Sequence, residues 1–399
     1  MSARSGPLAG ILVIDLSRAL AGPHAAMMLG DLGARVIKIE RPGSGDDSRG
    51  WGPPFVHPTG ADRESTYFFS ANRNKESVVL DLTEGHDLDV LSALLRRADV
   101  LVENFRPGVL TRLGLDAEGL TELNPRLVTL SISGFGHDGP ESARAGYDQI
   151  AQGETGLMSL TGPSANDPQR TGVPITDLLA GMYGAFGAVS ALHERERTSR
   201  GQIVRTSLLA AGIGVHAYQG TAWTVGGVRG RAAGNHHPSI SPYGLFPCAD
   251  GSVQLACGSE ALWRRLCAEF GLDAERPDIA TNADRVARRE VVAAELEKAF
   301  ADLPATRLLD RLAAAGVPAG RIRTLDEVYA WPQVESQGLK TTVHHETVGP
   351  MELPGPPLRF FRTGSGQEHE VTKRDHRAPP VLDADAEAVR AWLAAIDQP

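Results

Sequence analysis

The sequence predicts an α/β protein with a parallel sheet and a second, smaller domain. Strand-like and helix-like segments alternate up to about residue 135, a glycine-rich stretch breaks the composition near residue 226, and helical patterns follow to residue 325. Strands that alternate with helices favour a parallel sheet covered on both faces. At 399 residues the chain also exceeds one ordinary core, so two domains are expected.

The expected elements of the sheet domain are short apolar runs separated by helical patterns. Strands are predicted over 10–17, 35–40, 77–82, 99–104 and 127–133. Helices are predicted over 23–34, 85–98 and 178–197, and the stretch 204–225 is expected to be helix interrupted at Gly212 and Gly214. We expect three successive segments: 1–225, a small domain with its linkers over 226–325, and 326–399.

Composition narrows the classes of function. The net charge is −9, from 40 basic and 49 acidic side chains, which argues against nucleic-acid and polybasic membrane binding. No apolar run approaches the roughly 18 residues of a membrane span, and the run near residue 10 lacks a signal-peptide cleavage site. Three widely spaced cysteines fit a reducing compartment. A cytoplasmic protein is therefore expected.

Three familiar motifs are missing or incomplete. Glu40 ends a strand as the ribose-binding acid of a dinucleotide fold does, but "RALAGPHAA" replaces the glycine-rich pyrophosphate loop. The adjacent His236 and His237 have no partners at metal-ligand spacing, so no metal site is expected. "SISGFG" does not match the nucleophile elbow of serine hydrolases.

Basic residues follow or flank several strand ends, where open parallel sheets bind their ligands. Each alone is typical of a solvated surface charge, but together they could form a rim for phosphates. These residues are Arg41, Lys75, Arg106 and Arg112.

Asp177 is the most informative single residue. It stands at the start of a helix pattern in the apolar run "GVPITDLLAGMYGAFG". It could simply cap the helix, because a carboxylate interacts favourably with the positive helix end. It could also be a nucleophile, which the same helix end would keep ionised. The residues alone leave both readings open, and the two are compatible.

Several blocks in one order resemble the class III CoA-transferases, the family of formyl-CoA transferase and methylacyl-CoA racemase. The resemblance covers nearly the whole chain. Its blocks include "VIDLSRALAGPHAAMMLGDLGARVIKIERPGSGD", "ADVLVENFRPGVLTRLGL", "GYDQIAQGETGLMSLTG", "GVPITDLLAGMYGAFGAVSAL" and "AAGVPAGRIRTLDEV".

The resemblance implies roles for individual residues. Asp177 matches the catalytic nucleophile, which carries the acyl group as an aspartyl anhydride and then CoA as an aspartyl thioester. CoA itself belongs to the substrate, and no permanently bound cofactor is implied. The positions matching the CoA-binding residues are Ala21, Arg41, Leu80, Thr83, Asn104, Phe105, Arg106 and Arg112. Substrate or active-site loop positions are Tyr147, Gly226, Gly227, Gly234, Asn235 and His236.

The resemblance also implies a Rossmann-like large domain built from both chain ends, an inserted small domain, and two interlocked chains. Glycines at 181, 184 and 187, which clear one helical face, fit such a close association. The implied reaction moves CoA from an acyl-CoA to a free carboxylic acid, and "GNHHPSISPYGLF" resembles members that use succinyl-CoA or similar donors.

Two alternatives remain. A racemase of α-methylacyl-CoA needs a histidine at the position of Tyr147 as one of its acid–base groups, and tyrosine, with a pKa near 10, is a poor replacement. A CoA-binding protein without catalysis is the other alternative.

Overall fold

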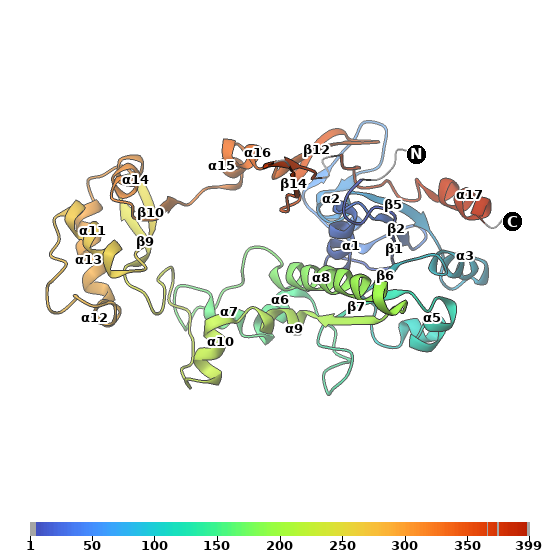
Figure 1. Ribbon diagram of the computed structural model, residues 1–399, viewed down its shortest axis with the longest axis horizontal. Helices are drawn as coiled ribbons and strands as arrows, with labels where there is room; N and C mark the ends of the chain where they lie inside the picture. The colour runs from blue at the N-terminus through green and yellow to red at the C-terminus, as the bar shows by residue number, and fades with distance from the viewer. Residues whose placement is uncertain (1–4, 365, 373–374, 397–399) are drawn as a thin grey trace. The chain divides into compact units, whose positions relative to one another are not determined.

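The computed structural model describes residues 5–364, 366–372 and 375–396, and its contacts divide the chain into two compact units (Figure 1). The large unit consists of Met1–Thr155, Thr171–Thr221 and Pro332–Pro399. The small unit consists of Gly156–Arg170 and Ala222–Trp331. This division groups Gly156–Arg170 with the small unit, whereas the sequence analysis placed that segment within 1–225.

A six-stranded sheet forms the centre of the large unit, and all its neighbouring strands are parallel. The strand order is β5-β2-β1-β6-β7-β8. The strands are β1 (Leu12–Asp15), β2 (Arg35–Glu40), β5 (Lys75–Val79), β6 (Val100–Glu103), β7 (Val128–Ser133) and β8 (Ile203–Ser207). From β1 the chain adds β2 and β5 on one side of the sheet, and from β6 it adds β7 and β8 on the other side. The carboxyl ends of β1 and β6 therefore flank the point at which ligands bind in open sheets.

The five predicted strands are present, but the expectation of helix over 204–225 is wrong at its start. Residues Ile203–Ser207 form β8, the edge strand that pairs with β7, and helices α9 (Leu208–Gly214) and α10 (Ala217–Thr224) follow. The β-branched residues Ile203, Val204 and Thr206 favour a strand. Side-chain exposure along β8 alternates, as expected for a strand with one covered face.

Helices cover both faces of the sheet. On one face, α1 (Ala21–Asp31) and α8 (Ile175–Thr198) enclose a core with β1, β6 and β7. On the other face, α3 (Gly85–Leu95), α5 (Ala117–Leu123) and α17 (Ala386–Ile396) enclose a second core. Val389 of α17 is fully buried there, and the Asp383 and Asp385 side chains accept hydrogen bonds from backbone N–H groups of β5. The C-terminal segment is thus part of the large unit.

The glycines of α8 allow close packing within the chain. A Cβ at Gly181 would lie 2.7 Å from the Ala21 carbonyl oxygen, and one at Gly184 would meet Leu130 of β7. Their spacing therefore explains the packing of α8 on α1 and the sheet, and it no longer argues for contact with a second chain. Contrary to our expectation, one helix, α8, is long and apolar enough to cross a membrane. Its residues Ala180 and Ala188 are, however, buried in the core of the large unit.

The small unit has its own core. A three-stranded antiparallel sheet of β9 (Tyr243–Cys248), β10 (Gly251–Ala256) and β11 (Ala319–Arg321) packs against helices, and Phe246, Trp263 and Phe300 are buried between them. The helices are α11 (Glu260–Phe270), α12 (Asn282–Ala287), α13 (Arg289–Phe300) and α14 (Ala305–Ala314).

The remaining elements are short. They are η1 (Asp47–Gly50), β3 (Phe55–Val56), β4 (Glu64–Ser65), α2 (Thr66–Ser70), α4 (Val109–Arg112), α6 (Asp148–Glu154), α7 (Leu157–Leu160), α15 (Leu325–Tyr329), α16 (Pro332–Ser336), β12 (Lys340–His345), β13 (Gly349–Pro354), β14 (Phe361–Gly364) and β15 (Gln367–Glu370).

Candidate active site

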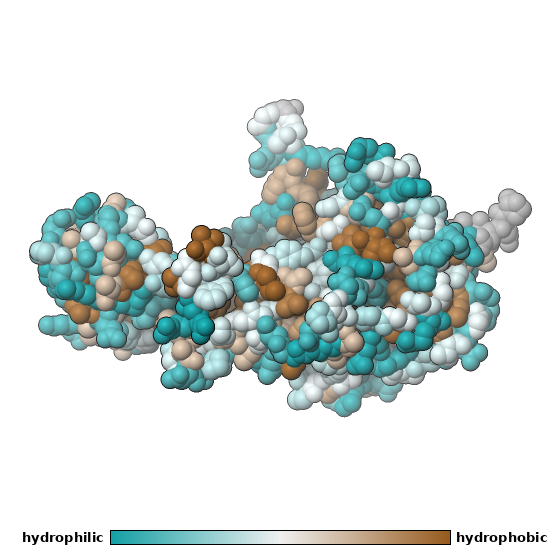
Figure 2. Space-filling view, turned by 90° about the horizontal axis from the view of Figure 1, so that it is seen from below, coloured by the Kyte–Doolittle hydropathy of each residue, from teal (hydrophilic) through white to brown (hydrophobic). Residues whose placement is uncertain are grey.

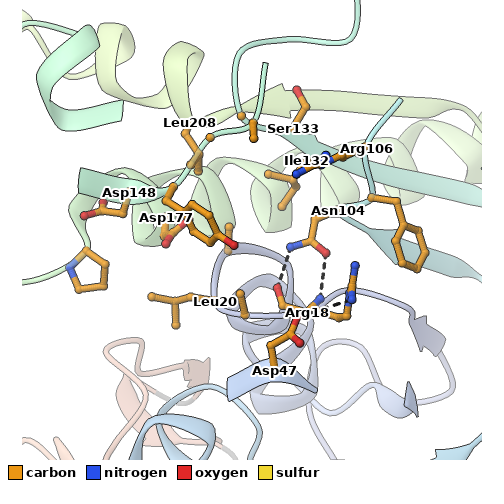
Figure 3. Close-up of a pocket in the computed structure, with 18 of the residues that line it drawn as sticks. Arg18, Leu20, Asp47, Asn104, Arg106, Ile132, Ser133, Asp148, Asp177 and Leu208 are labelled. Atoms are coloured by element: carbon orange, nitrogen blue, oxygen red, sulfur yellow. Dashed lines mark hydrogen bonds and ion pairs between the residues drawn. The ribbon is translucent and has the colours of Figure 1, made fainter. Parts of the chain in front are cut away.

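A pocket of about 420 Å³ opens at the carboxyl ends of β1, β6 and β7, within the large unit (Figure 3). Its walls come from the turn between β1 and α1, the segment after β6, the loop before α6, and the start of α8. Asp177 lines this pocket together with Ala21, Asn104, Phe105, Arg106 and Tyr147. The fold thus brings together six of the predicted site residues from four separate stretches of sequence.

The turn between β1 and α1 is fixed by polar contacts on both sides. Asn104 accepts a hydrogen bond from the Arg18 N–H at 2.8 Å and donates one to the Arg18 carbonyl oxygen at 2.7 Å (Figure 3). The next residue, Ala19, has a left-handed φ of 68° and donates its N–H to the buried Asp46 carboxylate at 3.0 Å. Lys38 forms an ion pair with the same carboxylate at 2.8 Å. These contacts hold a strained turn in one conformation.

Asp177 is the third residue of α8, and its carboxylate faces the pocket without a partner (Figure 3). Over the described part of the chain, it accepts no hydrogen bond and forms no ion pair. Burial, followed by the negative charge of Asp148, raises the pKa of Asp177 to about 7. The raised pKa is contrary to the expectation that the helix N-terminus keeps this carboxylate fully ionised at neutral pH.

Asp148 performs the capping function that the sequence suggested for Asp177. Its carboxylate accepts hydrogen bonds from the Thr176 N–H at 2.8 Å and the Thr176 hydroxyl at 2.7 Å. Its other oxygen accepts a hydrogen bond from Gln152 at 2.7 Å, and the Gln152 oxygen in turn accepts two from Thr171. Asp148 therefore satisfies a free N–H of the first turn of α8, and Asp177 makes no capping hydrogen bond there.

Two aromatic residues in the same pocket were missed by the sequence analysis. Tyr67 and Trp51 line it and pack edge to face, with ring centroids 4.9 Å apart. Burial, with Asp177 as the next cause, raises the pKa of Tyr67 to about 12, so its hydroxyl stays protonated at neutral pH. Trp51 directly follows the short helix η1 and Tyr67 lies in the five-residue helix α2, and no local sequence pattern singled them out.

A second pocket, of about 350 Å³, adjoins the first along the sheet edge. Arg41, Leu80 and Thr83 line it, and Arg18, Phe105 and Arg106 line both pockets. A ligand passing these three shared residues could reach from Arg41 and Thr83 to Asp177. The two pockets thus match an elongated molecule with an anionic part and a reactive end.

Other predicted residues lie elsewhere. Arg112 is exposed at the end of α4 and lines neither of these two pockets. Lys75, expected on the phosphate rim, is instead fully buried, because Asp15, Asn72 and the Pro23 carbonyl oxygen accept its three hydrogen bonds. The predicted loop residues Gly226, Gly227, Gly234, Asn235 and His236 belong to the small unit, where Asn235 lines a separate pocket.

The sequence model of the family described as "CoA-transferase family III" matches residues 8–385 of the chain. The chain belongs to this family. It is 39% identical over 379 residues to human (Homo sapiens) succinyl-CoA:glutarate CoA-transferase, covering 94% of this chain and 83% of that protein. It is 40% identical over 372 residues to succinate–glutarate CoA-transferase of Agrobacterium fabrum, covering 91% and 93%.

A solved structure is also similar throughout. The crystal structure of a CAIB/BAIF family protein from Brucella suis has a TM-score of 0.83 and 37% identity, with 98% of this chain and all of that chain covered. Family membership and these relatives identify the protein as an acyl-CoA:carboxylate CoA-transferase. The family that the sequence blocks resembled is thereby confirmed.

Proposed function

We propose that this CoA-transferase moves CoA from succinyl-CoA or a similar donor to a dicarboxylate such as glutarate, with Asp177 as nucleophile. The observation that carries the proposal is the unpaired Asp177 carboxylate in the pocket, whose capping role belongs to Asp148. The named activities of the human and Agrobacterium relatives support the substrate class.

The chemistry needs only carboxylates and a thiolate. An Asp177 oxygen attacks the thioester carbon, the C–S bond breaks, and an aspartyl anhydride and CoA thiolate form. The thiolate attacks the Asp177 acyl carbon, releasing the donor acid and leaving an aspartyl-CoA thioester. The acceptor carboxylate then attacks this thioester, and the returning thiolate cleaves the new anhydride to give the product thioester and free Asp177.

Oxyanions form at each tetrahedral step and need hydrogen-bond donors. The Tyr67 hydroxyl is one candidate, because it lines the pocket and remains protonated. The family resemblance supports Gly226, Gly227, Gly234, Asn235 and His236 as further candidates for an active-site loop. Such a loop would limit hydrolysis of the anhydride by excluding water.

The bound CoA would extend through both pockets. We assign its phosphates and adenosine to the pocket containing Arg41, Leu80 and Thr83, and its thioester to the pocket containing Asp177. Asn104, Phe105, Arg106 and the helix start at Ala21 would lie along its length. Arg112, one turn after Val109 at the pocket edge, would reach the phosphates from the rim.

We infer that the large unit is Rossmann-like and that two chains interlock. The outward winding of the sheet from β1 and β6 supports the first inference. Exposed apolar side chains support the second, since Met182, Tyr183 and Phe186 of α8 are 47%, 44% and 74% exposed. Figure 2 shows apolar patches among polar residues on one face. A cytoplasmic location fits this proposed metabolic role.

Exchange of labelled glutarate into glutaryl-CoA, with succinyl-CoA as donor, tests the proposed function. Wild type should catalyse the exchange, and Asp177→Asn should bind CoA but lose turnover by several orders of magnitude. Deuterium uptake at the α-carbon without acid exchange would instead indicate a racemase. CoA binding with neither reaction would indicate a non-catalytic protein.

A further inference from the structure

Three charged side chains form a row at the boundary between the two pockets. The Asp47 carboxylate pairs with the Arg41 guanidinium through one oxygen and lies 3.5 Å from an Arg18 nitrogen through the other. Arg41 lines one pocket, Asp47 lines the other, and Arg18 lines both. One carboxylate thus bridges two guanidinium groups where the pockets meet, and Figure 3 shows the Arg18 and Asp47 side chains of this bridge.

This bridge lies on the surface and is weakly held. The side chains of Arg18, Asp47 and Arg41 are 41%, 39% and 46% exposed. Ion pairs this exposed to water contribute little net stability, so the carboxylate can be displaced easily. A diphosphate binds guanidinium groups with the same bidentate geometry, carries two negative charges where a carboxylate carries one, and offers more acceptor oxygens.

The neighbouring acid shows the contrast. Asp46 is buried, pairs with Lys38 and accepts hydrogen bonds from Ala19 and Ser48. It fixes the loop, and the backbone of Arg18 is fixed by Asn104. Asp47 and the Arg18 side chain therefore project from a rigid backbone and remain free to exchange partners.

We propose that Arg18 and Arg41 together bind the diphosphate of CoA, and that Asp47 occupies their guanidinium groups until CoA displaces it. This inference rests on the proposed function for the identity of the ligand. The diphosphate is the part of CoA between the adenosine and the pantetheine arm, and Arg18 stands at the matching place between the two pockets. Asp47 then weakens CoA binding by competition and by repulsion of the bound diphosphate, which favours release of the product thioester.

Titration calorimetry with CoA tests the assignment without relying on catalysis. Asp47→Asn should bind CoA about threefold to tenfold more tightly than wild type, and the gain should shrink as ionic strength rises. Arg18→Gln should bind CoA more weakly, and adding Asp47→Asn to it should restore less than the same change gains in wild type. The control Asp89→Asn removes an equal charge from the exposed face of α3 and should leave the affinity unchanged.

Shorter ligands test which phosphate of CoA competes with Asp47 for the two arginines. The gain in Asp47→Asn should persist with dephospho-CoA, which keeps the diphosphate, and vanish with pantetheine, which has no phosphate. A gain lost with dephospho-CoA would overturn the assignment in favour of the 3′-phosphate. Unchanged or weaker CoA binding by Asp47→Asn would show that Asp47 only orients the arginines. Because these are binding measurements, failure of the exchange reaction would count against the proposed function and not against this assignment.

Discussion

The carboxylate of Asp148 accepts two hydrogen bonds from Thr176, the residue immediately before Asp177, at 2.8 Å and 2.7 Å. One acid therefore stabilises the start of α8, while the acid beside it faces the pocket unpaired. The same Asp148 charge is the second cause, after burial, of the raised pKa of Asp177. Position and reactivity of the proposed nucleophile thus depend on one neighbouring side chain.

Asp148→Asn separates these two effects. The amide can still accept hydrogen bonds from Thr176 but removes the negative charge beside Asp177. The acid limb of the pH profile of kcat/KM, expected near pH 7 in wild type, should move to lower pH. The NH2 group of asparagine would replace the Asp148 oxygen that accepts the hydrogen bond from Gln152, and an NH2 group cannot accept it. The substitution should therefore also lower the stability of the fold by about 1–3 kcal/mol. An unmoved acid limb would show that Asp148 has no electrostatic role.

Asp177 should also destabilise the fold as pH rises. Its pKa is raised from 3.8 to about 7, so the folded chain keeps a proton between about pH 4 and pH 7 that the unfolded chain has lost. Stability contributed by this group therefore falls as pH rises through that window. Asp177→Asn removes the titration, and its Tm should exceed that of wild type by more at pH 8 than at pH 5. A pH-independent difference in Tm would contradict the raised pKa.

Tyr67→Phe tests the proposed hydroxyl donor. The hydroxyl makes no hydrogen bond with any described residue, while the ring packs on Trp51. Stability should therefore change little, whereas kcat should fall about 10²-fold if the hydroxyl stabilises an oxyanion. Steady-state kinetics and thermal denaturation of the same preparation check both expectations. A Tyr67→Phe enzyme with normal kcat would assign the oxyanion contacts to other donors.

Substitution of Lys38 tests how much the buried ion pairs beside the pocket contribute to stability. Its fully buried amine pairs with Asp46 at 2.8 Å and lies 3.7 Å from Asp15. Lys38→Met would leave these buried carboxylates without that partner and should cost about 3–5 kcal/mol in urea denaturation. Lys340→Met is the matched control, because its partner Glu352 is exposed, and it should cost about 0–1 kcal/mol. Equal costs would mean that the buried pair is not important for stability.

The sheet was predictable where strands are buried on both faces. Val36, Ile37 and Ile39 supply buried β-branched residues within the run 35–40, and β2 spans the same residues. β8 was missed because an edge strand has only one covered face and because Ile203–Ser207 leads directly into a helix. Its strand state depends on pairing with β7, which lies far away in sequence.

The site was predictable only in part. Asp177 was singled out by its apolar surroundings in the sequence. The residue that caps the start of α8 is instead Asp148, which lies 28 residues before Thr176, and no local pattern predicts this contact. Lys75 resembled a surface charge because its three acceptors come from separate segments that only the fold brings together. Tyr67 likewise reaches the pocket through tertiary packing.

Covalent trapping on Asp177 tests the central claim most directly. Wild type incubated with succinyl-CoA and then with hydroxylamine should carry a hydroxamate on the peptide containing Asp177, detected by its mass shift, because both the anhydride and the thioester react with this nucleophile. Asp177→Asn should show neither the adduct nor the exchange. Exchange by wild type without an adduct on this peptide, together with near-normal exchange by Asp177→Asn, would contradict the account.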